Sequence, residues 1–528
     1  MKGEKGKIHK EMGIKKKVVR NIASQNAGRI TQTVLGIVIV PFLIKVLGPK
    51  GFGLIVFVES FLRFFDLTIS GLRSALGRYI GFSVYGGREE DAVSYVAAGK
   101  RILTIIISAV TVAGAVLWYY FPDIFNVTAE YGGDMKVLVL IMFFSFIFQM
   151  RFAPSRSVLY SFQRFDLLNM YDILRSIMRA LLCFLVYSVF APRLYYYGFI
   201  YFAALFTEQM LIIITARRLF PGFGAGKDFS PGQMRELFSY MGFRTIQFVS
   251  TVLYVNTDMI LINVFYGPFY NAVYSISLKF VDILRRVFQQ SLNVMNPTFT
   301  ELVAKGDRER VVRIFNSMTK TTALLTIPAC ILLALFGRDL ISLWVGGRFE
   351  GAVRPMYVHI LAASPLFIFA MTGSVMMSHA KVRLPAFMTL ICGVGNIFIS
   401  LYCALKLGWG LVGFAFGTLV ARLVQSLMFN PYYACKIIDV DYKNYMFRTF
   451  LKPLALGGFF GGLLFSMKFA MKMPVWHVAA AAAVAAPFYC VMAYILVLNP
   501  YEKSVVYQAY RKLVSMPGSR RSSRETKR

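Results

Sequence analysis

The sequence has few of the residues on which metal sites, disulfides and covalent catalysis depend. Its 528 residues include six cysteines and four histidines, and no two cysteines have the CxxC spacing. The cysteines lie in or at the ends of apolar stretches, where cysteine acts as a small hydrophobic residue. We therefore expect no disulfide framework, no bound metal and no cofactor.

Acidic residues are also scarce, because 26 Asp and Glu stand against 58 Lys and Arg, for a net charge of +32. Such a charge can indicate nucleic-acid binding in a soluble domain. Here 57% of the residues are hydrophobic, and the two properties together are typical of a multi-pass membrane protein with basic cytoplasmic loops. We expect no nucleic-acid partner.

No segment has the features of a nucleotide site. The stretch GFGAGKD at 222–228 has the glycines and lysine of a phosphate-binding loop, but Asp228 stands where Ser or Thr is required. Asp439 and Asp441 have the spacing of the metal-binding acid pair of glycosyltransferases. No cytoplasmic segment is long enough to fold a nucleotide-binding domain around them. We interpret the first stretch as a linker and the acid pair as structural.

The sequence is rich in long apolar stretches. About 14 stretches of roughly 20 residues, the length that spans the hydrocarbon core of a bilayer, recur between Ile30 and Leu498. With both termini inside, the cytoplasmic segments hold several times as many Lys and Arg residues as the outer segments. This asymmetry favours that topology. We expect an all-α membrane protein of about 14 transmembrane helices.

An internal repeat predicts how these helices are organised. LIKVLGPKGFG from Leu43 recurs as LINVFYGPFYN from Leu261, so that Gly48-Pro49 matches Gly267-Pro268. Both copies begin on the same side of the membrane, which indicates two parallel six-helix lobes related by a pseudo-twofold axis along the membrane normal. The expected domains are a basic cytoplasmic tail (1–20), an N-lobe (21–216), a cytoplasmic linker (217–236), a C-lobe (237–436), an appended helix pair (437–500) and a second basic cytoplasmic tail (501–528). The tails are either topology signals or patches that bind anionic membrane lipids.

Several of the predicted spans carry charged residues. Each costs roughly 2.5 to 3.5 kcal/mol at the bilayer centre, so charged side chains are expected to face a protein or water-filled interior. Some can pair locally, since Asp172 is at helical spacing from Arg175 and Arg179. Positive charge remains in surplus, and we expect a cationic cavity for an anionic substrate. Its candidate residues are Arg29, Arg63, Arg151, Arg156, Arg175, Arg179, Arg244, Lys279 and Arg286.

The second and eighth spans are related by the repeat, and their charges are opposite in sign at matching positions. Glu59 corresponds to Lys279, Arg63 to Asp282, and Asp66 to Arg285 or Arg286. We expect these residues to form ion pairs between the lobes that break and re-form during alternation between inward and outward states.

Asp258 lies near the middle of the seventh span. Two interpretations stay open. The carboxylate could couple protonation or cation binding to motion, or it could be a structural group paired with a nearby cation.

Several short motifs resemble a known family. The Gly-Pro turn followed by FGL, SALGRYI at Ser74, DMILI at Asp258, YSISLKF at Tyr274 and NPTFTELVAKGD at Asn296 are similar to those of polysaccharide-biosynthesis flippases, the Wzx-like members of the multidrug/oligosaccharidyl-lipid/polysaccharide exporter superfamily. The resemblance implies a non-enzymatic flippase of the bacterial inner membrane. It would move undecaprenyl-pyrophosphate-linked oligosaccharide repeat units of O-antigen or exopolysaccharide type across the bilayer. A polysaccharide polymerase and glycosyltransferases are the implied protein partners.

Three alternatives differ in what they require of the sequence. A major-facilitator transporter needs a basic motif between its second and third spans, where this chain has GFSVYGGREEDA. A multidrug exporter of the same superfamily would have a more acidic cavity. An O-antigen polymerase or ligase, which is an enzyme, needs a long outer loop with catalytic Arg or His, and the longest outer loop, 337–355, is short and lacks histidine.

Overall fold

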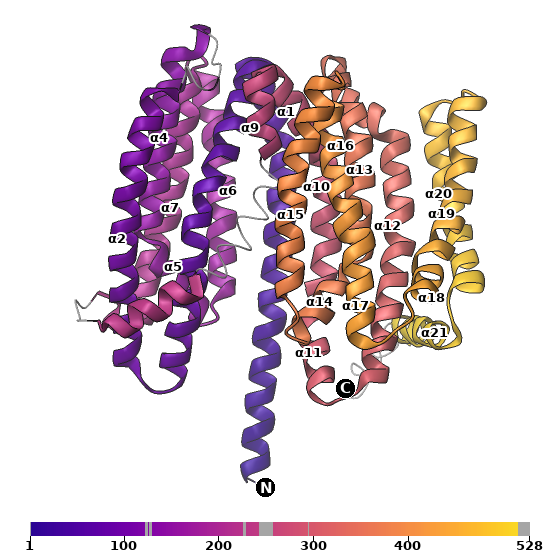
Figure 1. Cartoon of the computed structure of the whole chain (residues 1–528), viewed down its shortest axis with the longest axis horizontal. Helices are drawn as coiled ribbons and strands as arrows, with labels where there is room; N and C mark the ends of the chain where they lie inside the picture. Colours follow the sequence, from indigo (N-terminus) through magenta and orange to yellow (C-terminus); the bar gives the residue numbers. More distant parts are fainter. Residues whose placement is uncertain are drawn as a thin grey trace, which may run out of the picture. The chain divides into compact units, whose positions relative to one another are not determined.

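The computed structural model describes residues 2–121, 125, 129–224, 229–241, 257–293 and 295–515, and in these ranges it contains helices and no strands (Figure 1). The first group of helices is α1 (Lys2–Tyr85), α2 (Glu89–Tyr119), α4 (Gly132–Arg151), α5 (Ala153–Ser161), α6 (Phe165–Val189) and α7 (Leu194–Leu219). Next come α9 (Thr257–Tyr266), α10 (Pro268–Asn293), α11 (Asn296–Ala304), α12 (Arg308–Val345), α13 (Val353–Ile368), α14 (Met371–Ser378), α15 (Arg383–Leu401), α16 (Leu411–Arg422) and α17 (Asn430–Ile438). The last are α18 (Tyr442–Met446), α19 (Lys452–Phe465), α20 (Val475–Met492) and α21 (Pro500–Ser515).

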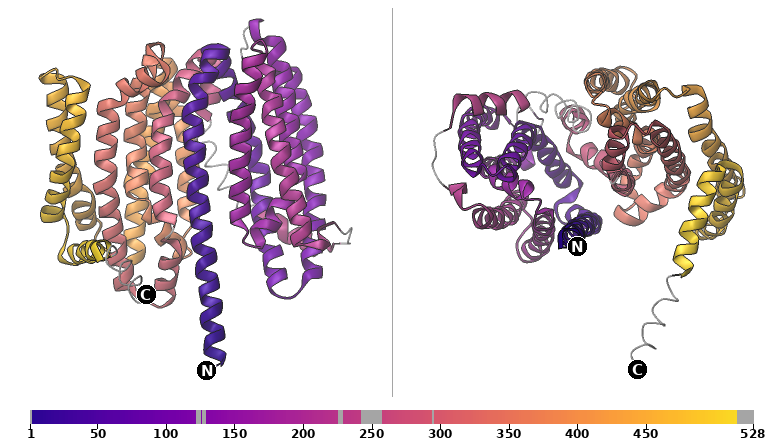
Figure 2. Two further views of the ribbon diagram at one scale, coloured as in Figure 1. Left: turned by 180° about the vertical axis from the view of Figure 1, so that it is seen from behind. Right: turned by 90° about the horizontal axis from the view of Figure 1, so that it is seen from below.

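By contacts between its residues, the chain divides into two compact units. One consists of Met1–Lys279, Ile341–Pro355 and Ala386–Thr418, and the other of Phe280–Leu340, Met356–Pro385 and Leu419–Arg528. In the first unit, α4 packs against α7, α6 against α7, and α1 against α2, α5 and α6. Figure 2 shows these helices end-on as one bundle.

The second unit has its own aromatic core. Phe315 of α12 stacks on Tyr445 of α18, with ring centroids 4.8 Å apart, and Phe369 packs beside Tyr445. The helices α19 and α20 lie side by side next to this core (Figure 1). A buried ion pair of 2.8 Å between Lys320 and Glu502 joins α12 to α21.

The two Gly-Pro turns of the sequence repeat have similar backbone conformations. Gly48 interrupts α1 with φ 72°, and Gly267 separates α9 from α10 with φ 86°. Only glycine adopts such angles readily. The proline that follows each glycine fits the first turn of the next helix, because N–H groups there have no acceptor within the helix and proline therefore loses no hydrogen bond. The two turns also touch. A Cβ atom on Gly53 would lie 1.8 Å from the carbonyl oxygen of Pro268, so the absence of a side chain at Gly53 is what permits this approach.

Ten helical segments among the described residues are long and apolar enough to cross a membrane. The predicted spans that are not among these ten include the second half of α1, α6 and α10. Their apolar character is interrupted by charged residues, such as Asp172, Arg175 and Arg179 in α6. The chain is therefore an all-helical, multi-pass membrane protein.

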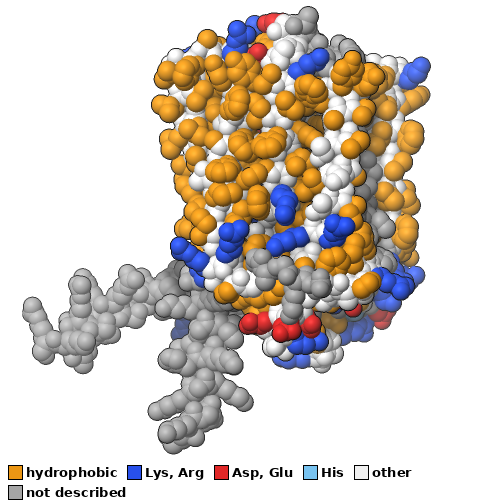
Figure 3. Space-filling model, turned by 90° about the vertical axis from the view of Figure 1, so that its left-hand side faces the viewer, with side chains coloured by type: hydrophobic (Ala, Val, Ile, Leu, Met, Phe, Trp, Pro, Cys, Tyr) orange, Lys and Arg blue, Asp and Glu red, His pale blue; other side chains and the backbone are white. Residues whose placement is uncertain are grey.

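The outer surface of the described helices suits a lipid environment. Figure 3 shows one face covered by hydrophobic side chains over most of its height, with Lys and Arg toward both ends and more of them toward the lower one. Large apolar side chains such as Leu181, Leu185 and Phe398 are more than half exposed, which a water-soluble surface would rarely tolerate over so wide an area.

Candidate functional site

A network of ion pairs occupies the interior of the first unit. The carboxylate of Glu208 on α7, whose side chain is completely buried, accepts hydrogen bonds from Arg156 of α5 at 2.8 Å and from Arg175 of α6 at 2.9 Å. Arg156 also donates to both oxygens of Asp172 at 2.9 Å. Three helices are thus joined by charge-assisted hydrogen bonds, which are about twice as strong as neutral ones.

A second group of charges surrounds Glu59 on α1. Arg179 of α6 donates to its carboxylate at 3.3 Å, and the hydroxyl of Tyr197 on α7 donates to the same oxygen at 2.5 Å. The guanidinium of Arg63, one turn further along α1, lies 4.0 Å from the other oxygen. Glu59 therefore fixes the end of the Arg179 side chain.

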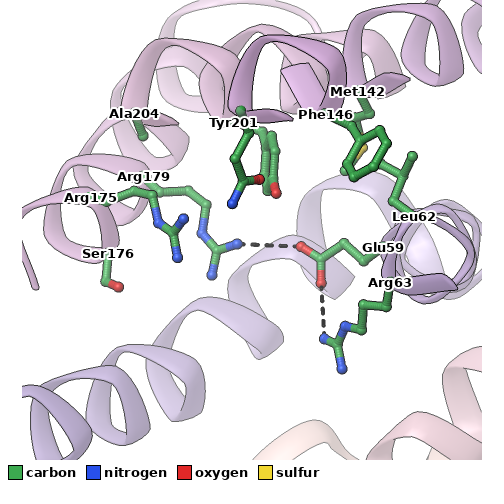
Figure 4. A pocket seen from close by; sticks show the side chains of 11 residues that line it. Glu59, Leu62, Arg63, Met142, Phe146, Arg175, Ser176, Arg179, Tyr201 and Ala204 are labelled. Atoms are coloured by element: carbon green, nitrogen blue, oxygen red, sulfur yellow. Dashed lines mark hydrogen bonds and ion pairs between the residues drawn. The ribbon is translucent and has the colours of Figure 1, made fainter. Parts of the chain in front are cut away.

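The second group opens onto a cavity of about 220 Å³ (Figure 4). Arg63, Arg175 and Arg179 line it together with Glu59 and the polar side chains of Ser176, Gln149 and Tyr201. The sequence predicted that these arginines share an interior site, and the described structure brings them to one cavity. Each of them also has a carboxylate partner, so the positive surplus at this place is smaller than the sequence suggested.

Asp258 lies in a different environment at the start of α9. Its side chain is buried, and one carboxylate oxygen accepts hydrogen bonds from the hydroxyls of Tyr274 at 2.7 Å and Thr418 at 3.0 Å. Thr418 also lies 3.4 Å from the side-chain oxygen of Asn396. Among the described residues, the other oxygen of Asp258 has no hydrogen-bond partner, and no cation forms an ion pair with this carboxylate. The interpretation of Asp258 as one half of a structural ion pair therefore has no support in the described part of the chain.

The remaining predicted residues occupy several places. Asp282 pairs with Arg285 one turn away on α10 at 2.8 Å, and Lys279 and Arg286 lie on the same helix. Arg151 is exposed at the end of α4. Arg244 lies outside the described residues, as do the side chains of Arg29 and Asp66.

Sequence reasoning missed the hydroxyl and amide partners of the carboxylates. Tyr197, Tyr274, Thr418 and Asn396 belong to residue types that are common in membrane helices, so composition does not mark them. The one available signal is that Asn396 and Ser400 stand one turn apart in an otherwise apolar stretch, and the two side chains contact each other at 3.2 Å.

Among the described residues, no cluster of three His, Cys, Asp or Glu side chains has the arrangement of a metal site.

The fold is similar to that of two solved membrane transporters. An inward closed structure of the lipid II flippase MurJ gives a TM-score of 0.65 at 15% sequence identity, covering 89% of this chain and 98% of that one. An inward-facing multidrug resistance MATE family transporter of the MOP superfamily gives 0.64 at 11% identity, covering 78% of this chain and 96% of that one. At these identities the two likenesses show that this chain has the fold of those transporters.

The family is also shown by sequence. Residues 18–303, more than half of the chain, match the family described as polysaccharide biosynthesis protein, and the chain belongs to that family. A curated relative is the uncharacterized membrane protein EpsK of Bacillus subtilis (strain 168), 22% identical over 504 residues, which are 93% of this chain and 98% of the relative. The resemblance inferred from the short motifs is confirmed. The family description names polysaccharide biosynthesis, and the fold is one that a lipid II flippase and a MATE family transporter share.

Proposed function

We propose that the protein flips undecaprenyl-pyrophosphate-linked oligosaccharide repeat units, of O-antigen or exopolysaccharide type, across the bacterial inner membrane by alternating access. The observation that carries this proposal is the polar cavity lined by Arg63, Arg175 and Arg179 in a protein surrounded by lipid. One guanidinium group can bind two phosphate oxygens at once, and it stays charged when water is removed. The similar fold of a lipid II flippase and the family description support the same class of substrate.

The proposal includes the topology expected from the sequence. Both termini lie in the cytoplasm, about 14 helices cross the membrane, and two six-helix lobes are followed by an appended helix pair. The basic tails bind anionic lipids of the cytoplasmic leaflet. A polymerase and glycosyltransferases act on the substrate before and after the transport step. An inside-negative potential favours outward movement of negative charge by about 2.3 kcal/mol per charge per 100 mV.

The proposal also includes a coupling role for Asp258. Among the described residues, one oxygen of this buried carboxylate has no partner and the other is hydrogen-bonded only by neutral groups, an arrangement suited to bind a proton or a small cation. Either event would change the charge at the junction of α9, α10 and α16, and so could favour one conformation over the other.

The first test is leaflet transfer in proteoliposomes that contain the purified protein and an undecaprenyl-pyrophosphate-linked oligosaccharide. We expect protein-dependent transfer, and a fall of about tenfold in Arg179→Gln, because one charge-assisted contact to the pyrophosphate is lost. Arg179→Lys should fall between the two, since it keeps the charge but not the paired donors. Arg101→Gln, at an exposed position of α2 outside the cavity, is the matched control.

Two results would count against this function. If no pyrophosphate-linked glycan is transferred while organic cations are exported, the multidrug-exporter alternative is supported. If the lipid-linked glycan is instead lengthened or ligated, the protein is an enzyme of the polymerase or ligase kind.

Charge reversal tests which partner of Glu59 matters. The observed contact predicts that Glu59→Arg and Arg179→Glu each lower the free energy of unfolding by about 1 to 3 kcal/mol, and that the double variant recovers more than half of the loss. Thermal unfolding in detergent measures this.

The proposed inter-lobe pairs predict instead that Glu59→Lys is rescued in the transfer assay by Lys279→Glu. Failure of that rescue would remove the Glu59–Lys279 pair from the proposal.

A further inference from the structure

A second polar cavity lies in the first unit, at the end of the bundle where α1 turns into α2. It has a volume of about 360 Å³ and is lined by Arg73, Ser74 and Arg78 of α1, by Arg156, Ser157 and Tyr160 of α5, by Leu168 of α6 and by Tyr240. Three guanidinium groups thus border it, and none of the described residues that line it is acidic. The proposed topology places this end of the bundle on the cytoplasmic side.

The cavity is built on a fixed scaffold. The hydroxyls of Ser157 and Ser161 on α5 donate to the backbone carbonyls of Arg73 at 3.2 Å and of Gly77 at 2.8 Å. These bonds hold α5 against the stretch of α1 that carries the cavity's arginines. Arg73 and Arg78 are therefore presented from a rigid helix pair, which suits recognition better than a loop would.

Tyr240 forms the opposite wall, and it is also held in place. It belongs to a short helix over residues 231–241, which is attached to α2 by a 2.6 Å hydrogen bond from Tyr95 to Glu236. The Tyr79 ring packs edge-on against Tyr240, and the guanidinium of Arg78 lies 5.3 Å from the centre of the Tyr240 ring. No described carboxylate forms an ion pair with Arg78, so its charge is available to an anion.

A wider chamber of about 890 Å³ adjoins this cavity, because Arg78 and Tyr160 line both. Its wall combines aromatic rings, Phe82, Tyr85, Tyr160 and Phe165, with the polar side chains of Arg88, Ser161 and Gln163. Aromatic faces suit the apolar C–H faces of sugar rings, while amide, hydroxyl and guanidinium groups suit their hydroxyls. The two volumes span the range of about 300 to 1,000 Å³ that is usual for ligand sites.

The basic cavity is linked to the cavity of Figure 4 by ion pairs. Arg156 borders the basic cavity and shares Glu208 with Arg175, which lines the other one. Along α6, Leu168 and Arg175 are seven residues apart, a rise of about 10 Å. An anion in the basic cavity would therefore be about two helical turns from Arg175 and about three from Arg179.

We propose that Arg73 and Arg78, walled by Tyr160 and Tyr240, form a loading subsite that binds the diphosphate of a lipid-linked saccharide, with its first sugars in the adjoining aromatic chamber. This inference rests on the proposed function. The substrate binds there first and then moves along α6 to the cavity at Arg175 and Arg179. The phosphate of an anionic phospholipid has the same chemistry as one phosphate of this diphosphate, but the phospholipid carries no saccharide.

The test is equilibrium binding to the full-length protein in phosphatidylcholine nanodiscs. The probes are undecaprenyl diphosphate, the same lipid carrying a short oligosaccharide, and phosphatidylglycerol as a competitor. Arg78→Gln should raise Kd about tenfold for both diphosphate probes, as expected for loss of one charge-assisted contact. Phe82→Ala, which changes the wall of the adjoining chamber only, should raise Kd for the glycosylated probe only. Arg101→Gln should leave both values unchanged, and Arg73→Gln replaces Arg78→Gln if that variant does not fold.

The outcomes separate this subsite from the proposed function. An unchanged Kd for both diphosphate probes in Arg78→Gln and Arg73→Gln overturns the subsite, even if the wild-type protein flips its substrate. Equal competition by phosphatidylglycerol also overturns it, because the cavity would then be a site for bulk lipid. Binding that is sensitive to Arg78, combined with no transfer in proteoliposomes, supports the subsite and overturns flipping.

Discussion

Replacing Glu208 by alanine is expected to lower the free energy of unfolding by about 3 to 5 kcal/mol. Its carboxylate is fully buried and balances Arg156 and Arg175 at 2.8 and 2.9 Å. Without it, Arg156 keeps only Asp172, and Arg175 keeps none of its ion pairs among the described residues. An unbalanced charge inside a membrane protein is costly because neither water nor lipid compensates it.

Thermal and denaturant unfolding in detergent micelles would measure this loss. Glu208→Gln is expected to be nearly as harmful, since it keeps the shape but not the charge. Glu301→Ala is the control. It removes an ion pair with Lys305, one turn away, that lies at the surface, and exposed pairs of this kind contribute little. A loss below about 1 kcal/mol in Glu208→Ala would mean that water reaches the two arginines.

Replacing Asp258 by asparagine is expected to reduce leaflet transfer by more than tenfold and to leave the melting temperature almost unchanged. Asparagine has the same shape, and its oxygen can still accept the hydrogen bonds from Tyr274 and Thr418. It cannot release a proton or balance a cation at a buried position, so the coupling step would fail.

The measurement is transfer in proteoliposomes with an imposed proton gradient and, separately, a sodium gradient. Tyr274→Phe is the matched control, because it removes one hydrogen bond and keeps the carboxylate. It should slow transfer while preserving its dependence on the gradient. If Asp258→Asn transfers at the wild-type rate under both gradients, this carboxylate does not couple ions to transport.

The sequence was most informative where one residue type is required. The Gly48 and Gly267 turns were found from the repeat because each needs glycine at positive φ followed by proline. The all-helical membrane class followed from the length of the apolar stretches, since the bilayer sets that length. Asp439 and Asp441, which have the spacing of a metal-binding pair, were expected to be structural. Asp439 pairs with Arg308 at 2.9 Å, and Asp441 caps α18 by accepting a hydrogen bond from the backbone of Asn444.

Pairings between helices were less predictable. Spacing alone allowed Asp172 to pair with Arg175 or Arg179 on its own helix, yet its observed ion pair is with Arg156 of α5. A guanidinium from a neighbouring helix can meet both carboxylate oxygens, and a residue one turn away on the same helix rarely can. The same limit applies to Glu59, whose contacts with Arg179 and Tyr197 bridge distant parts of the chain. The division into two six-helix lobes stays a prediction.

The contact between Gly53 and the carbonyl of Pro268 has a mechanical consequence. With no room for a methyl group there, the two backbones are in direct contact, and α1 and the first turn of α10 can tilt about this point. From that point α10 extends for 26 residues, or about 39 Å. Because the contact is at one end of the helix, a tilt of about 10° about it would move the other end by about 7 Å. A contact set by one missing methyl group can thus determine which end of the helix moves.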